Sequence, residues 1–342
     1  MKKLLTIILL VLLVSGLVFA NGEQEGTTKK DNNLVLITST AADNINAVVP
    51  AFEEKYGIKV DLITGSTGEV FSRIQAESAN PSCDITWIGE YYVLNSPDLF
   101  EEYVSSNDSQ YPEGFRNKSG LLTATNGTAP VIMWNKEMVP EGISSYKDLL
   151  NPELQGKIAF GDAATSSSAY NHLENMLIDF GDGDVFAEEG WDFVKQLLTQ
   201  LNGKVVNSSS VTYKGVVSGE YAVGLSWDAP ALQLINSETS NVGFCYMEEG
   251  SASKVSGIAI MKNCNNLENA KLFVDFISSQ EGQELLANNS AGANPIRTDI
   301  EFPEYKQIMK TANIFSVDAV WSSTIKAQVQ EKFTDLFMDY VE

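Results

Sequence analysis

The sequence predicts an α/β fold built from two successive α/β layers. Short apolar stretches of β-type residues alternate with segments that carry apolar residues at helical spacing, first over 34–88 and again over 156–261. Between them, Asn126-Gly127-Thr128 interrupts two β-type stretches, and a wholly apolar run follows at 131–134. Alternating strands and helices are typical of a mostly parallel sheet that is covered by helices.

The first layer is expected to hold three strands and two helices. The first helix should end at Gly57, because glycine commonly terminates a helix in the left-handed conformation. The elements expected in chain order are a strand at 34–38, a helix at 45–56, a strand at 58–63, a helix opened by Gly65–Glu69, and a strand at 84–88.

The second layer repeats this alternation and leads into C-terminal helices. Two strands near its end flank a glycine-bearing segment at Gly250, which suits a return crossing to the first layer. Helices are expected at 146–150, from Ser166 onward, at 189–201, 213–218, 267–277, 281–286 and 324–340, and strands at 156–160, 204–206, 221–225, 242–247 and 256–261.

The N-terminus predicts export. Lys2 and Lys3 precede an apolar run at 4–13, and small residues lead to Ala20. This pattern is typical of a signal peptide over 1–20 that is cleaved near Ala20, and the apolar run is shorter than the roughly 20 residues of a membrane span. Residues 21–32 are expected to form a flexible leader, and the mature chain is expected to be periplasmic.

The charge balance and the cysteines argue against some classes of function. The chain has 45 acidic and 23 basic side chains, a net charge of −22, so nucleic-acid binding is not expected. The three cysteines, Cys83, Cys245 and Cys264, lack metal-ligand spacing. Their odd number leaves at least one thiol unpaired, and a bridge between Cys245 and Cys264 stays an open alternative.

Four expected strands run into turns that are rich in hydroxyl and glycine residues and that open helices. Helix N-termini offer free N–H groups and partial positive charge, and ligands of open α/β sheets bind beyond the carboxyl ends of the strands. Each turn taken singly is also explained as an ordinary helix cap. The turns are Ser39-Thr40, Gly65–Glu69, Asp162–Ser168 and Ser208–Ser210.

Several segments, in order along nearly the whole mature chain, carry a family resemblance. The chain resembles the family 1 extracellular solute-binding proteins, in the branch of ferric-iron-binding proteins and their sugar-phosphate- and phosphonate-binding relatives. The resembling segments are 65–77, 129–136, 149–169, 213–231 and 273–297.

The resemblance implies the fold and the class of function. It implies a two-lobed periplasmic-binding-protein fold of type II, α/β and hinged, with a ligand cleft between the lobes. Lobe 1 would hold 33–126 plus 256–342 with the C-terminal helices, and lobe 2 would hold 127–255. The resemblance also implies a monomer without cofactor that delivers a small molecule to the membrane permease of an ABC importer.

The residues favour an anionic organic ligand, such as a sugar phosphate or phosphonate, over iron. Ferric-binding members hold Fe³⁺ through adjacent tyrosines, but Trp227-Asp228 stand at the matching positions here. Fe³⁺ remains the alternative, with Glu90, Tyr91 and Tyr92 as ligands, and an organic cation or polyamine is a further one. The expected ligand-binding residues are Ser39, Thr40, Ser66, Thr67, Gly68, Glu69, Gly89, Thr165, Ser166, Ser167, Ser168, Tyr213, Trp227 and Asp228.

Enzymatic activity is not expected. The single histidine, His172, excludes most His-based catalytic triads and multi-His metal sites, and its place inside a helix favours a structural role. No Gly-x-Ser-x-Gly elbow precedes a suitable helix. The segment 65–69 is too short for a nucleotide-binding phosphate loop and lacks its lysine.

Overall fold

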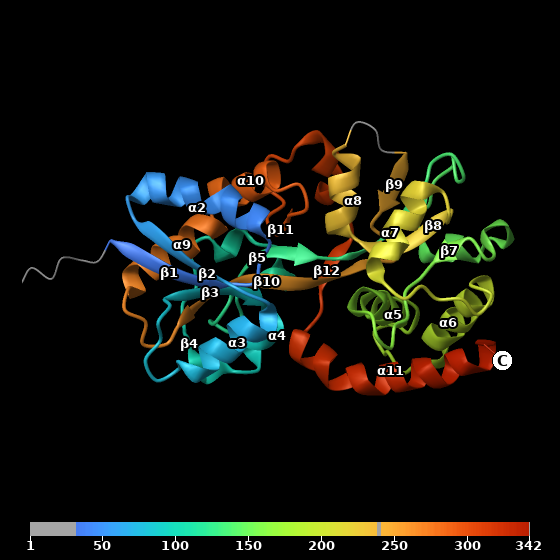
Figure 1. The fold of residues 1–342 in the computed structure, drawn as a ribbon, viewed down its shortest axis with the longest axis horizontal. Helices are drawn as coiled ribbons and strands as arrows, with labels where there is room; N and C mark the ends of the chain where they lie inside the picture. Colours follow the sequence, from blue (N-terminus) through green and yellow to red (C-terminus); the bar gives the residue numbers. More distant parts are fainter. Residues whose placement is uncertain (1–31, 238–240, 342) are drawn as a thin grey trace, which may run out of the picture. The chain divides into compact units, whose positions relative to one another are not determined.

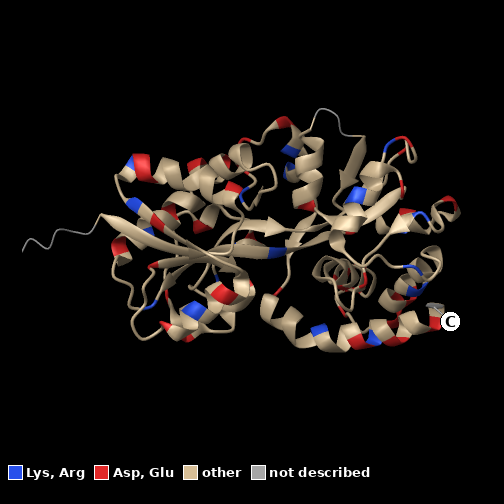
Figure 2. Ribbon diagram, viewed as in Figure 1, with Lys and Arg blue, Asp and Glu red and all other residues tan. Residues whose placement is uncertain are grey.

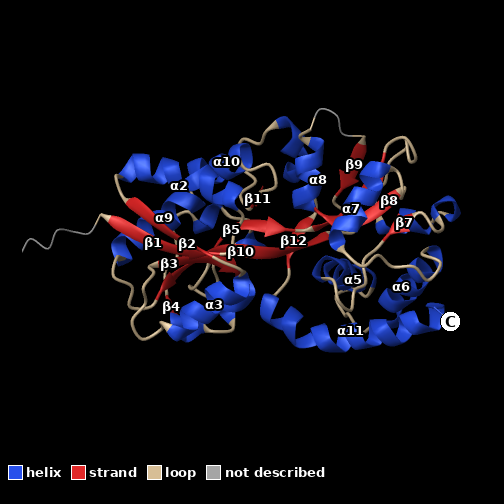
Figure 3. Cartoon of the chain, in the orientation of Figure 1, coloured by secondary structure: helices blue, strands red, loops and turns tan. Residues whose placement is uncertain are grey.

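The computed structural model describes residues 32–237 and 241–341, which form two β-sheets surrounded by helices (Figures 1 and 3). The first sheet has the strand order β11-β5-β10-β3-β1-β2, and β4 and β12 pair with β10 at its two ends. Its strands are β1 (Asn33–Thr38), β2 (Lys59–Thr64), β3 (Ile85–Gly89), β4 (Phe100–Glu101), β5 (Thr123–Thr128), β10 (Ser251–Met261), β11 (Asn294–Pro295) and β12 (Ile314–Ser316).

The second sheet has four strands in the order β7-β8-β6-β9 among the described residues. They are β6 (Pro130–Asn135), β7 (Ile158–Ala159), β8 (Val223–Trp227) and β9 (Val242–Cys245). In the described part of the chain, two crossings connect strands of one sheet with strands of the other. The first lies at 128–130 between β5 and β6, and the second lies between β9 and the start of β10.

Helices cover both sheets, and most lie where apolar periodicity predicts them. The α-helices are α2 (Ala42–Tyr56), α3 (Thr67–Ala76), α4 (Glu90–Leu94), α5 (Ser167–Phe180), α6 (Glu188–Gln200), α7 (Ser209–Ser218), α8 (Asp228–Ile235), α9 (Leu267–Ser278), α10 (Gln280–Asn289) and α11 (Ala319–Val341). Short 3₁₀ turns are η1 (Pro97–Leu99), η2 (Asp108–Gln110), η3 (Glu113–Phe115), η4 (Tyr146–Leu150), η5 (Pro152–Leu154) and η6 (Glu304–Lys310). Within the described ranges, no helix has both the length and the apolarity that a bilayer span requires.

The expectation of mostly parallel sheets is wrong. Strand β1 pairs parallel with β2 and β3, as predicted, but β10 is antiparallel to both β3 and β5. In the second sheet β6 is antiparallel to β8 and β9, and only β7 with β8 is parallel. The first sheet mixes parallel and antiparallel pairs because β10 enters it in the direction opposite to β3 and β5. The strand expected at 204–206 is reduced to one bridge between Val206 and Gly161.

The first sheet buries both of its faces. Leu34 and Leu36 of β1 pack with α2 and α9 through Phe52 and Phe273. The alternate residue Ile37 packs on the opposite side with Ile74 of α3. Burial on both faces explains why the strand reads as a continuous apolar run.

The C-terminal helix α11 packs on the second core. Ile325, Val329 and Phe333 join the cluster formed by Ile158 and Leu177 of the second α/β layer. The lobe boundaries expected from the sequence placed this helix in lobe 1. The boundaries stay a prediction, but this packing favours a second lobe that includes α11, because apolar contacts keep a helix with the core it covers.

Candidate functional site

A cavity of about 520 Å³ lies where elements of both α/β layers meet. Its walls come from the end of β3, from α4, from the first turn of α5, from β10 and from the start of α11. Its size is typical of small-molecule sites. The lining residues are Gly89, Glu90, Tyr91, Tyr92, Ser167, Tyr170, Asn171, Lys254, Val255, Val317, Ala319, Ser322, Ser323 and Lys326.

The wall from the first layer holds one carboxyl group and two phenols. Glu90 begins α4 directly after β3, and burial together with the negative charge of Asp318 raises its pKa to about 7, although Lys254 opposes the shift. The rings of Tyr91 and Tyr92 meet edge to face with centroids 5.3 Å apart. The structure therefore brings the three residues of the iron alternative to the same cavity as Gly89 and Ser167.

The wall from the second layer is the N-terminus of α5. Ser166 caps this helix, since its Oγ accepts a hydrogen bond from the backbone N–H of Ala169 at 3.4 Å. Ser167 is the first helical residue and lines the cavity, whereas the hydroxyl of Thr165 donates to Asp162 at 2.9 Å. Ser168 lies 3.4 Å from Ser166, Oγ to Oγ. Of these four predicted residues, only Ser167 lines the cavity.

Two lysines complete the cavity and were not predicted from the sequence. Lys254 of β10 donates to Glu174 and, at 2.7 Å, to the hydroxyl of Ser322. The ammonium of Lys326 lies 5.0 Å from the centroid of the Tyr170 ring, within the range of a cation–π contact. The i, i+4 spacing of Ser322 and Lys326 places them on one face of α11, but nothing local shows that this face meets α5.

Most of the predicted residues from the first layer gather at the ends of β1 and β2, outside the lining of this cavity. The hydroxyl of Thr67 donates to Ser39 at 3.1 Å, while the hydroxyl of Thr40 accepts from Asn44 at 3.1 Å. Ser66 and Glu69 form a capping box that opens α3, and the bonds from Ser66 lower the pKa of Glu69. A Cβ on Gly68 would meet open space.

Trp227 and Asp228 have different environments. Trp227 ends β8 half-buried, with its ring centroid 5.7 Å from that of Tyr213. Asp228 is 1% exposed, and its Oδ2 accepts from the Ala129 N–H at 3.1 Å and from Asn294 at 2.6 Å. Its Oδ1 has no partner among the described residues. Asp228 therefore links α8 to the first crossing and to β11, and a ligand contact there would have to use Oδ1.

Burial raises the pKa of Asp228 to about 6, although the hydrogen bonds from Asn294 and Ala129 oppose the shift. His172 is fully buried as well. Its Nδ1 lies 2.8 Å from the Tyr146 hydroxyl and its Nε2 lies 2.6 Å from the Ser226 carbonyl oxygen. Burial lowers the pKa of His172 to about 4. Both contacts support the structural role expected for this histidine.

The described residues contain no group of three or more His, Cys, Asp or Glu side chains arranged to hold a metal ion. All three cysteines are free thiols. Acidic and basic side chains are interspersed over the helices (Figure 2), so a ligand must be held by local groups rather than by a face of one sign.

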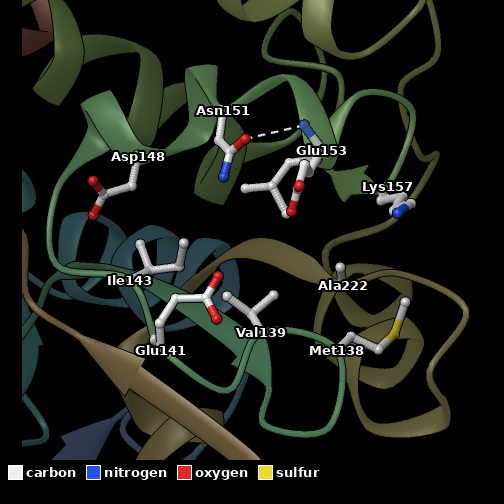
Figure 4. A pocket seen from close by; sticks show the side chains of 11 residues that line it. Met138, Val139, Glu141, Ile143, Asp148, Asn151, Glu153, Lys157 and Ala222 are labelled. Carbon is white, nitrogen blue, oxygen red and sulfur yellow. Dashed lines mark hydrogen bonds between the residues drawn. The ribbon is translucent and has the colours of Figure 1, made fainter.

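A second, smaller cavity of about 180 Å³ lies beside the turns η4 and η5 (Figure 4). Two of its polar side chains, Asp148 and Asn151, already serve the local fold. Asp148 accepts from the backbone N–H groups of Ser144 and Ser145 at 2.9 and 3.0 Å, and Asn151 accepts from that of Glu153 at 3.0 Å. These are capping bonds, and the first cavity remains the candidate site.

Comparisons with known proteins place the chain among transport proteins. Residues 47–311 match the family model of the bacterial extracellular solute-binding proteins. The chain is 26% identical to iron uptake protein A1 of Synechocystis sp. over 301 residues, which cover 82% of each chain.

Two solved structures share the fold. The periplasmic binding protein AfuA from Actinobacillus pleuropneumoniae, with exogenous fructose-6-phosphate bound, gives a TM-score of 0.65 at 23% identity, over 90% of this chain and 98% of that one. The Trichodesmium protein IdiA (FutA), in complex with iron and citrate ligands, gives 0.73 at 21% identity, over 89% and 99%. The two-lobed periplasmic-binding fold that the resemblance implied is thereby confirmed.

Proposed function

Because this chain belongs to the bacterial extracellular solute-binding proteins, we propose that it captures a compact anionic organic molecule, such as a sugar phosphate or phosphonate, in the cavity between α4 and α5. The chain is the substrate-binding component of an ABC transporter and not an enzyme. Its partners are a small ligand and the transporter's permease. We place it in the periplasm as a monomer, released from a signal peptide near Ala20.

The observation that carries the choice of ligand is the set of donors around the cavity. Lys254 and Lys326 line it together with Ser167 at the N-terminus of the 14-residue helix α5. Ammonium groups and the free N–H groups of a helix N-terminus both favour an oxyanion. Since the phenols of Tyr91, Tyr92 and Tyr170 line the same space, the organic part of the ligand would meet aromatic and hydroxyl groups.

Ferric iron is the second candidate, because Glu90, Tyr91 and Tyr92 share the cavity. A hard trivalent cation prefers carboxylate and phenolate oxygens. Lys326 disfavours it, since it adds a positive charge to the same space, whereas Glu174 compensates the charge of Lys254. Lys326 disfavours an organic cation or polyamine in the same way, and Glu90 is the one carboxylate among the lining residues.

Calorimetry with fructose 6-phosphate, 2-aminoethylphosphonate and ferric citrate separates these candidates. We expect a phosphorylated or phosphonate probe to bind, and Lys326→Met to lose about 1.5–3 kcal/mol of binding free energy, which is about one to two decades in affinity. Lys332→Met is the matched control, because it removes the same charge from the same helix at an exposed position over Trp191.

A visible absorption band with ferric citrate, lost in Tyr91→Phe or Tyr92→Phe, would instead establish iron as the cargo. Native mass spectrometry of the purified protein gives an independent answer, since a tightly held ligand co-purifies. Equal binding of every anion by the parent and Lys326→Met would contradict the assignment of this cavity.

We also propose that the two lobes close over the ligand by bending at the two crossings. The first crossing lies at 128–130 and the second at the start of β10, where Asn175 of α5 accepts from the backbone N–H of Ala252 at 2.6 Å. Hinge closure of this kind is measured as a smaller radius of gyration in small-angle scattering. An unchanged radius with ligand demonstrably bound would argue against mobile lobes.

A further inference from the structure

Lys254 lies close to the second crossing between the two sheets. It lies in β10, where it pairs with Thr128, the last residue of β5 before the first crossing. Two residues further along, Ser256 of β10 pairs with Gly89 of β3 in the first sheet. Lys254 is therefore carried by a strand that links the lobes, and its side chain, which is 27% exposed, lines the candidate ligand cavity.

The ammonium of Lys254 donates hydrogen bonds to side chains of two other elements, α5 and α11. Glu174 of α5 has a side chain that is only 1% exposed and accepts a hydrogen bond from Lys254. Ser322 of α11 accepts from the same ammonium at 2.7 Å and donates to Glu174. An ammonium has three N–H donors, and these contacts use two of them. Among the described residues the third has no protein acceptor.

From these contacts we propose that Lys254 is a ligand-binding residue on the hinge strand, with Glu174 and Ser322 as the positioning residues that aim its third N–H into the cavity. This inference rests on the proposed function, since it needs an anionic ligand. A lysine side chain otherwise extends toward water. The buried Glu174 prevents this by fixing the ammonium at the cavity wall.

In this arrangement one bound anion would contact residues from separate parts of the fold. An anion that contacts Lys254 and also the N-terminus of α5 at Ser167 joins the hinge strand to the second layer. Contact with the α4 wall joins the same anion to the first layer. Because Glu174 already compensates the charge of Lys254, the contact acts as one charge-assisted hydrogen bond and not as an isolated ion pair. We expect its loss to weaken binding about 10-fold.

The test compares four variants of the full mature chain, titrated with inorganic phosphate, fructose 6-phosphate and 2-aminoethylphosphonate. Lys254→Met should weaken every probe that binds the parent. Lys262→Met, which removes the same charge from an exposed position directly after the same strand, should not. Ser322→Ala should weaken binding about 2- to 10-fold, because it removes the hydroxyl that bonds both Lys254 and Glu174, and Ser322→Thr should restore it.

Thermal unfolding of each variant separates positioning from simple stability. A purely structural ion pair would lower the unfolding temperature and leave the affinity of the folded protein unchanged, which would overturn the inference. If Lys254→Met does not fold, the two Ser322 variants decide, since both charges remain. Equal affinities of Lys254→Met and Lys262→Met refute the inference alone. A parent that binds none of the three anions refutes the proposed function and the inference together.

Discussion

The substitution Asp228→Asn tests how the protein holds a buried carboxyl group at the junction of its two sheets. The Oδ2 atom of Asp228 accepts from Ala129 at the first crossing and from Asn294 of β11. An asparagine keeps one oxygen that accepts both bonds and removes the charge. The pH dependence of the comparison therefore reports the cost of ionising this group inside the protein, because the amide group does not titrate.

The magnitude follows from the pKa. The ordinary pKa of the carboxyl group is 3.8, and burial raises it to about 6 in the folded protein. The folded state therefore binds the proton more tightly than the unfolded chain does. The stability that this group contributes is present below the unfolded pKa and is lost as pH rises through the folded pKa. The loss is about 2 kcal/mol between about pH 4 and pH 6.

Urea unfolding of the parent and Asp228→Asn across this range provides the assay. The stability of the parent relative to the variant should fall by about 2 kcal/mol as pH rises, because the contributions of distant groups cancel in the difference. Lys306, a neighbouring buried cation whose pKa is lowered to about 7, stays mostly protonated over most of the window. A difference that does not change with pH would refute the reasoning.

Three further predictions concern other parts of the chain. Burial lowers the pKa of His172 from 6.5 to about 4, so stability should be lost as pH falls through this range, by about 3 kcal/mol, and His172→Gln should flatten that part of the unfolding profile. Phe333→Ala on α11 should cost about 3–5 kcal/mol in urea unfolding, because this side chain is fully buried in the second core. Trp321→Ala at an exposed site of the same helix should cost about 0.5 kcal/mol or less, and equal costs would show that α11 is not anchored there. For export, N-terminal sequencing of the periplasmic fraction should begin near Asn21, outside the described residues, and a start at Met1 would contradict it.

Local patterns in the sequence were enough to locate most helices and strands. Gly57 does end α2 in the left-handed conformation, with φ of 65°, and Ser166 does cap α5. These features depend on residues within one or two turns of the chain, which is why periodicity and capping chemistry find them. The same local motifs carried the family resemblance, which the family match then confirmed.

The antiparallel pairing of β10 and the set of residues that line the cavity could not be predicted from local sequence patterns. Glu90, Ser167, Lys254 and Ser322 lie on four elements that are far apart in the sequence and meet only in the folded protein. Three of the hydroxyl-rich turns cap helices, at Ser66, Ser166 and Ser208, and only the one before α5 also forms a cavity wall. Sequence alone thus determined most of the helices and strands and the family to which the chain belongs. The tertiary structure decided which side chains share a cavity, because such neighbours depend on long-range packing and not on local preference.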